Sequence, residues 1–208
     1  DDLARINSSI SRLNIWQRYR VDENHIKTLT HALEKKPSIK ELYFTSEKIT
    51  LKGIEELAIL LNKISITDFT LYRKVLKEDE IKIFTERLKG NITLKSIELN
   101  FKDINDEIVE YLNTLVKPES SITSLSISAI SITLEGTEKL ISMLKGNSSL
   151  TSINLSIDQI NEKDADKLTE ALNCKFIPLR SKLNDEPWQN RLKEEKVLKS
   201  LTDLQLSH

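Results

Sequence analysis

The sequence contains little of what covalent cross-links, phosphate loops and membrane spans require. Among 208 residues there is one cysteine, Cys174, and there are four glycines. A single cysteine excludes an internal disulfide framework and favours a reducing compartment, so we expect a cytoplasmic location. Four scattered glycines do not form a glycine-rich phosphate loop. No apolar run approaches the roughly 18 residues that a membrane-spanning helix needs, so we expect no membrane insertion.

The chain also lacks an excess of charge of either sign. It has 31 lysines and arginines against 32 aspartates and glutamates, for a net charge of −1. A protein that binds the phosphate backbone of nucleic acid needs a basic surplus or a basic face, so we expect no nucleic-acid partner. The hydrophobic fraction of 38% is sufficient for a packed core.

The sequence does contain an internal repeat. Stretches in which apolar residues nearly alternate recur at spacings of 29, 27, 28, 28 and 28 residues. Their first apolar residues, used here as anchors, are Ile10, Ile39, Ile66, Leu94, Ile122 and Leu150. Regular spacing of this length is typical of a protein built from stacked structural repeats.

Each repeat changes its apolar period halfway. Apolar residues three and five positions after the anchor share one face of a strand. Helical spacing follows, as in Ile54, Leu57 and Leu61. We therefore predict units of strand, turn and helix that bury their apolar faces only by stacking on neighbours. About ten residues after the anchors we expect further apolar core positions at Val21, Ile49, Val75, Ile104, Ile132 and Ile160.

These patterns resemble the ribonuclease-inhibitor-like leucine-rich repeat, whose apolar and glycine slots are occupied here by Ile39, Leu42, Phe44, Ile49, Gly53, Leu57 and Leu61. The resemblance implies an α/β solenoid shaped like a horseshoe, with a parallel sheet on the concave side and helices on the convex side. It implies one domain over residues 1–208, with about seven to eight repeats. Because repeat-like segments reach both termini, we expect both ends to be truncated from a longer protein.

Two features depart from the family pattern. The slot eight residues after the anchor usually holds Asn or Cys, but here it holds Arg18, Glu47, Lys74, Lys102, Ile130 and Asp158. We therefore expect looser turns at these positions. Near the C-terminus we expect a degenerate repeat with Cys174, Ile177 and Leu179 in its strand, followed by another with Leu201, Leu204 and Leu206.

No set of residues indicates catalysis or metal binding. Cys174 has no histidine nearby in the sequence and fits a buried structural position. His25 and His31 are six residues apart, so on a helix they point in different directions, and with His208 and Cys174 they form no ligand set. We therefore expect no enzyme, no cofactor, no metal and no small-molecule substrate.

The side chains two, four and six residues after each anchor should form the exposed face of the sheet. In the first half of the chain this face carries aromatic and charged residues, and in the second half mostly Ser and Asn. Trp, Tyr and Arg most often dominate protein interfaces. We predict a partner-binding patch of Arg12, Trp16, Tyr43, Asp68, Tyr72 and Arg73, although a preceding repeat would alternatively cover Trp16.

The predicted function is therefore protein–protein interaction. The Lys-, Ile-, Asn- and Ser-rich composition and irregular repeats are similar to those of leucine-rich-repeat effectors that intracellular bacteria inject into host cells. That resemblance implies a host protein as partner, in the host cytosol. One alternative is an activator of a small GTPase acting through Arg18, Arg20 or Arg73. Another is a structural array attached to a catalytic domain outside this chain.

Overall fold

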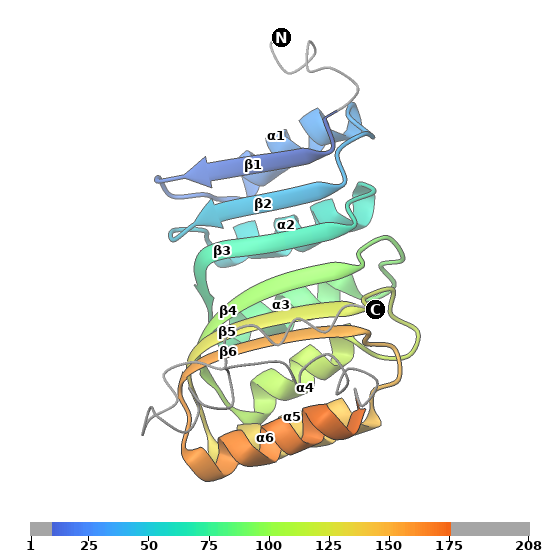
Figure 1. Cartoon of the computed structure of the whole chain (residues 1–208). Helices are drawn as coiled ribbons and strands as arrows, with labels where there is room; N and C mark the ends of the chain where they lie inside the picture. Colours follow the sequence, from blue (N-terminus) through green and yellow to red (C-terminus); the bar gives the residue numbers. More distant parts are fainter. Residues whose placement is uncertain (1–9, 176–208) are drawn as a thin grey trace.

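The computed structural model describes residues 10–175, except for the side chains of Arg73 and of residues 173–175. Within this part, strands and helices alternate (Figure 1). The strands are Arg12–Gln17 (β1), Glu41–Ser46 (β2), Asp68–Leu76 (β3), Ser96–Ile104 (β4), Ser124–Ile132 (β5) and Ser152–Gln159 (β6). The helices are Glu23–Glu34 (α1), Leu51–Lys63 (α2), Glu78–Leu88 (α3), Asp106–Leu115 (α4), Leu134–Gly146 (α5) and Glu162–Lys175 (α6).

The six strands form one open parallel sheet in the order β1-β2-β3-β4-β5-β6. Sequence neighbours are therefore neighbours in space. The first residues of the strands are aligned in the register Arg12, Glu41, Asp68, Ser96, Ser124 and Ser152. These residues have the same spacing as the anchors, so the α/β class and the strand–helix unit predicted from the sequence are confirmed.

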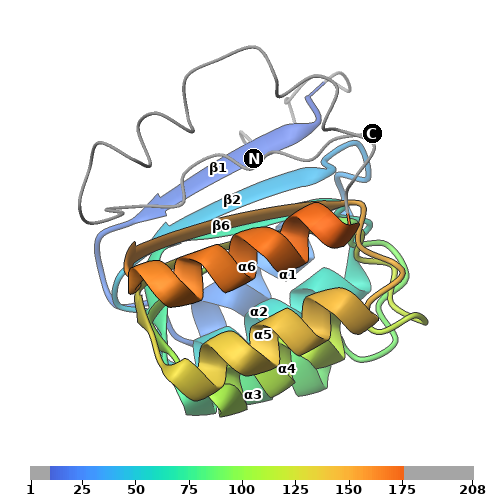
Figure 2. The same ribbon diagram turned by 60° about the horizontal axis from the view of Figure 1, so that its bottom comes forward.

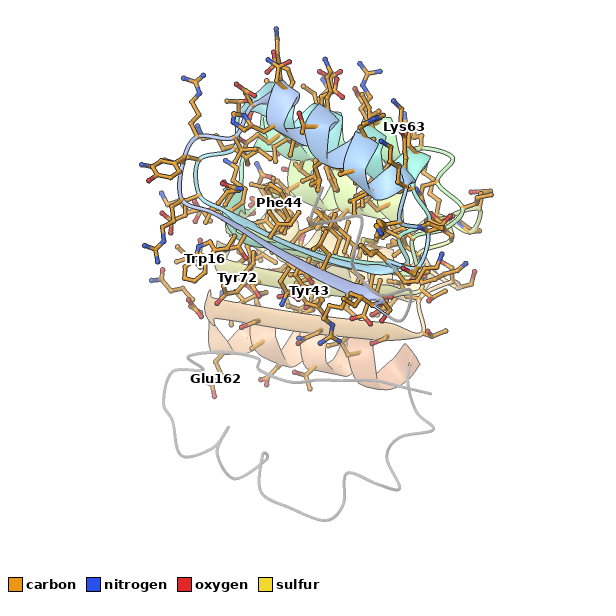
Figure 3. All side chains as sticks on the ribbon, turned by 90° about the horizontal axis from the view of Figure 1, so that it is seen from above. Trp16, Tyr43, Phe44, Lys63, Tyr72 and Glu162 are labelled. Atoms are coloured by element: carbon orange, nitrogen blue, oxygen red, sulfur yellow. The ribbon has the colours of Figure 1, made fainter. Side chains whose placement is uncertain are left out.

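The helices pack side by side along one face of the sheet (Figure 2). In Figure 3, which looks along the stack, α1 lies on one outer side of the strands and α6 on the other. The sheet is therefore curved, and its uncovered face lies on the inside of the curve. We call this uncovered face the inner face; no helix of residues 10–175 lies on it.

The core lies between the sheet and the helices. Strand residues three and five positions after the anchors point into it, and Leu42, Phe44, Phe69 and Leu71 are each at most 1% exposed. The rings of Phe69 in β3 and Phe84 in α3 stack with centroids 6.0 Å apart. Among the anchors, Ile10 is the exception at 40% exposure, because it precedes the edge strand β1.

The helices begin where polar side chains accept backbone amides. Thr50 Oγ1 accepts the amide of Gly53, and Thr133 Oγ1 accepts that of Gly136. At Gly136 a Cβ would lie 2.4 Å from the carbonyl oxygen of Ile104. A side chain would therefore push α5 away from the end of β4 in the neighbouring unit, which explains why this position holds glycine.

Strand β3 corrects one core assignment. It pairs with β2 through Tyr72 but resumes its pairing with β4 only at Val75, opposite Asn100. The extra residues in β3 form a bulge that shifts the side-chain alternation. Val75, predicted to be in the core, is consequently 45% exposed, and Leu76 is buried at 3% exposure.

The slot eight residues after the anchor differs from one unit to the next. Pairing is irregular between β3 and β4, as expected, but β4 and β5 continue in register past this slot to Ile104 and Ile132. In β3 the slot holds Lys74, whose Nζ lies 2.7 Å from Oε1 of Glu80, with both side chains buried. A buried ion pair therefore occupies the slot in which the leucine-rich-repeat pattern usually has Asn or Cys.

The prediction for Cys174 as a strand residue is wrong, because this residue lies in α6. The spacing of Leu168 and Leu172 continues the helix through this point, and both side chains are buried. The remaining residues of that predicted repeat, Ile177 and Leu179, and the later set of Leu201, Leu204 and Leu206 lie outside the described residues. Residues 10–175 contain no helix with the length and apolar character needed to cross a membrane.

Candidate partner-binding surface

The most exposed aromatic residues of the strands lie on the inner face. Trp16 is 61% exposed and Tyr72 is 52% exposed. Both align with Thr45 of β2, so the register places them one strand apart on either side of it. Figure 3 shows Trp16, Tyr43 and Tyr72 on the side of the strands opposite to Phe44, which points toward the helices. Two large aromatic side chains are thus presented together toward solvent.

Arg12, Glu41 and Tyr43 form a cross-strand cluster beside this pair. The Nε of Arg12 donates to Oε2 of Glu41 over 2.7 Å. The guanidinium carbon lies 5.2 Å from the centre of the Tyr43 ring. The hydrogen bond that Arg12 donates to Glu41 raises the pKa of Arg12 above its ordinary value. Tyr43 is only partly exposed and is held in place by these contacts.

Asp68 and Arg73 complete the residues predicted from the sequence. Asp68 lies at the start of β3, aligned with Glu41, and its Oδ2 accepts the hydroxyl of Thr67 over 2.6 Å. Arg73 lies in β3, but its side chain is outside the described part. Arg12, Trp16, Tyr43, Asp68 and Tyr72 therefore share the inner face across β1, β2 and β3.

Two arginines of the alternative GTPase hypothesis, Arg18 and Arg20, lie in the loop between β1 and α1, and the third, Arg73, lies in β3. The guanidinium carbon of Arg18 is 5.0 Å from the centre of the Trp16 ring, and Arg20 is exposed just before the bridge residue Val21. Arg18 therefore enlarges the surface around Trp16. A cation stacked on an aromatic ring is a common element of protein interfaces.

A shallow hollow extends this surface beyond the residues predicted from the sequence. It has a volume of about 280 Å³ and spans the ends of β3, β4, β5 and β6. Its exposed apolar residues are Tyr72, Val75 and Ile130, and buried Phe101 and Ala129 form its floor. Ile130 could have been found from the sequence, because it is an apolar residue in the slot eight residues after the anchor, which is polar in the other five units. Val75 could not be found, because the bulge that exposes it leaves no mark in the spacing.

The second half of the inner face is polar and nearly flat. Its side chains are Ser96, Glu98, Asn100, Ser124, Ser126, Ser128, Ser152, Asn154 and Ser156. They alternate with buried core residues, as predicted. These small side chains make the apolar hollow beside them accessible to a partner.

His25 and His31, the histidines among residues 10–175, both lie in α1 and not on the sheet. His31 is exposed in α1, and His25 lies at the start of that helix, with Nδ1 2.7 Å from Oδ1 of Asp22. The hydrogen bond from His25 lowers the pKa of Asp22, which caps the helix. Among residues 10–175 no group of three or more His, Cys, Asp or Glu side chains is arranged to hold a metal ion.

No protein-family model matches the chain, and a search of curated proteins finds no significant match.

Proposed function

We propose that this chain is a leucine-rich-repeat domain of the ribonuclease-inhibitor-like type that recognises a partner protein through its inner face. The family assignment is supported by the parallel register at spacings of 27 to 29 residues. It is further supported by the tight glycine slots at Gly53 and Gly136, where a Cβ would approach neighbouring atoms at 2.8 Å and 2.4 Å. On this assignment, the curved sheet is the concave side of a solenoid.

The observation that carries the binding function is the exposure of Trp16 and Tyr72 on one rigid face. Trp16 is in β1 and Tyr72 is in β3, and both strands pair with β2. The backbone positions of the two residues are therefore fixed relative to each other. A rigid pair of aromatic side chains offers large contact area with little loss of conformational entropy on binding. Arg18 over the Trp16 ring and Arg12 over the Tyr43 ring add polar contacts at the margin of this patch.

We propose the cytosol as the compartment, and the host cytosol if the chain is an injected effector. One cysteine in 208 residues supports a reducing compartment. The similarity in composition to bacterial leucine-rich-repeat effectors supports a host protein as partner.

The test is affinity capture from cell lysate, with the wild-type chain beside Trp16→Ala/Tyr72→Ala. If the two aromatic residues are hot spots, each truncation weakens a bound partner by about 2 kcal/mol or more, and the double variant loses it. The matched control is Ile92→Ala/Leu134→Ala, which removes side chains that are 79% and 52% exposed away from the inner face. Circular dichroism verifies that all chains fold.

A partner lost by the first variant and kept by the control supports the proposal. A partner kept by both variants contradicts it and moves attention to the helices and loops.

A further inference from the structure

Carboxylates outnumber cations at the described strand positions of the inner face. At the positions two, four and six residues after the anchors, the charged side chains are Arg12, Glu41, Asp68 and Glu98. Arg12 is already paired with Glu41 at 2.7 Å. Asp68 and Glu98 have only hydroxyl donors, from Thr67 and Thr70 respectively, and no cation partner among the described residues. Neither carboxylate is held in an ion pair by a described residue, although Asp68 also attracts the guanidinium of Arg12.

A third carboxylate lies at the other side of the hollow. Asp158 lines it from the end of β6, is exposed, and has no cation partner among residues 10–175. Lys102 in β4 lies 3.9 Å from Asp103 and is paired with that carboxylate. Asp158 is therefore the acidic residue that lines the hollow, and Glu98 lies two residues before Asn100, which also lines it.

The apolar hollow and the carboxylates of the inner face lie close enough together to contact one helical segment of a partner protein. Glu98 and Asn100 are two residues apart in β4, and Asn100 lines the hollow. Two residues of a strand span about 7 Å, and neighbouring strands lie about 4.8 Å apart. An α-helix of about 14 residues is about 21 Å long, enough to cross the strands from β3, which holds Asp68, to β6, which holds Asp158.

Resting on the proposed function, we infer that the partner segment bound by the inner face is a basic amphipathic one. Its apolar side enters the hollow lined by Tyr72, Val75 and Ile130, and its Lys or Arg side chains face Asp68, Glu98 and Asp158. Each unbalanced carboxylate gains a counter-charge in such a complex. A segment with acidic residues at the same positions is repelled.

The test uses two defined peptides of about 14 residues, one of Lys and Leu and one of Glu and Leu with the same apolar positions. Fluorescence anisotropy with labelled peptides measures their binding to the full chain. We expect the Lys/Leu peptide to bind at least about tenfold more tightly at low salt, with the difference shrinking as salt screens the charges.

The charge variant is Asp68→Asn/Glu98→Gln/Asp158→Asn. It should weaken binding of the Lys/Leu peptide by about tenfold, because three exposed ion pairs are lost. The matched control is Glu135→Gln/Glu138→Gln/Asp166→Asn, which removes the same net charge from exposed positions of α5 and α6. The control should bind as the wild type does. The hollow variant Val75→Ser/Ile130→Ser should also weaken binding.

Three results overturn the inference: equal binding of the two peptides, equal loss in the charge variant and the control, or no binding of the Lys/Leu peptide. The proposed function is judged separately by the captured partner. A partner lost with Trp16→Ala/Tyr72→Ala but kept by the charge variant leaves the proposed function standing and rejects a basic segment as its ligand.

Discussion

Single residues decide how this chain departs from a regular repeat. Lys74 occupies a slot that usually holds Asn or Cys in the leucine-rich-repeat pattern, and the sequence alone marks it only as a departure. The structure places its ammonium 2.7 Å from Glu80, whose other oxygen accepts the backbone amide of Lys77 at the start of α3. Both side chains are less than 10% exposed. The pair thus links the end of a strand to the beginning of the following helix.

Removing one member of this pair should destabilise the fold. Lys74→Met leaves the carboxylate of Glu80 buried without its counter-charge, which costs about 3 to 5 kcal/mol of unfolding free energy. Adding Glu80→Gln should restore much of that loss, because a neutral amide can still accept from Lys77 and needs no cation. Urea denaturation of wild type, both single variants and the double variant measures this coupling. Additive losses in the double variant would mean that the two residues act independently.

At the scale of elements, asparagine side chains bind the backbone in two of the loops that precede strands, which the sequence analysis did not predict. The Oδ1 atom of Asn147 accepts the amides of Ser149 and Leu150 at 2.9 Å and 2.8 Å, and its Nδ2 donates to the carbonyl of Val116. Asn91 makes equivalent contacts two units earlier, in the loop before β4. Its Oδ1 accepts the amide of Leu94 over 2.8 Å. Asparagine side chains therefore hold the loop backbone before two of the strands, β4 and β6.

Asn147→Ala should destabilise the fold by about 2 kcal/mol, because it leaves buried backbone groups without partners. Asn147 is 9% exposed and Leu150 is 4% exposed, so water does not easily replace the lost bonds. The matched control is Asn113→Ala, at an exposed position of α4, which should be neutral or slightly stabilising. Thermal unfolding followed by circular dichroism distinguishes the two. Equal midpoints would show that the loop does not depend on this side chain.

Comparison of the elements with the sequence shows which features of the fold and of the inner face could be predicted. The repeat spacing predicted the strand–helix units and the parallel order, because apolar periodicity and unit length are visible in the residues themselves. It also identified Trp16, Tyr43 and Tyr72 as inner-face residues. It could not reveal the exposure of Val75, because a bulge changes pairing without changing spacing. Nor could it place Cys174, where a helical period continues into a region without a clear repeat.

At the scale of the whole molecule, the bulge divides the sheet into two differently constructed halves. Strand β3 pairs with β2 as far as Tyr72, and its last residues turn toward β4 (Figure 1). The carbonyl of Leu71, left without a strand partner in β4, accepts Nδ2 of Asn100 over 2.8 Å. The aromatic and charged half of the inner face ends here, and the half rich in serine begins. We call this junction the seam.

The seam should be the first place where the array opens. In a stacked repeat protein each unit contacts only its neighbours, so stability depends on each interface separately. Asn100→Ala removes the side-chain bond across the seam and should weaken it by about 1 kcal/mol. We expect faster amide hydrogen exchange at the facing ends of β3 and β4, with little change between β5 and β6. Ser128→Ala, at the equivalent position of β5, is the control and should change neither region. Faster exchange spread evenly over all strands would instead indicate that the sheet opens as one cooperative unit, with no weak point at the seam.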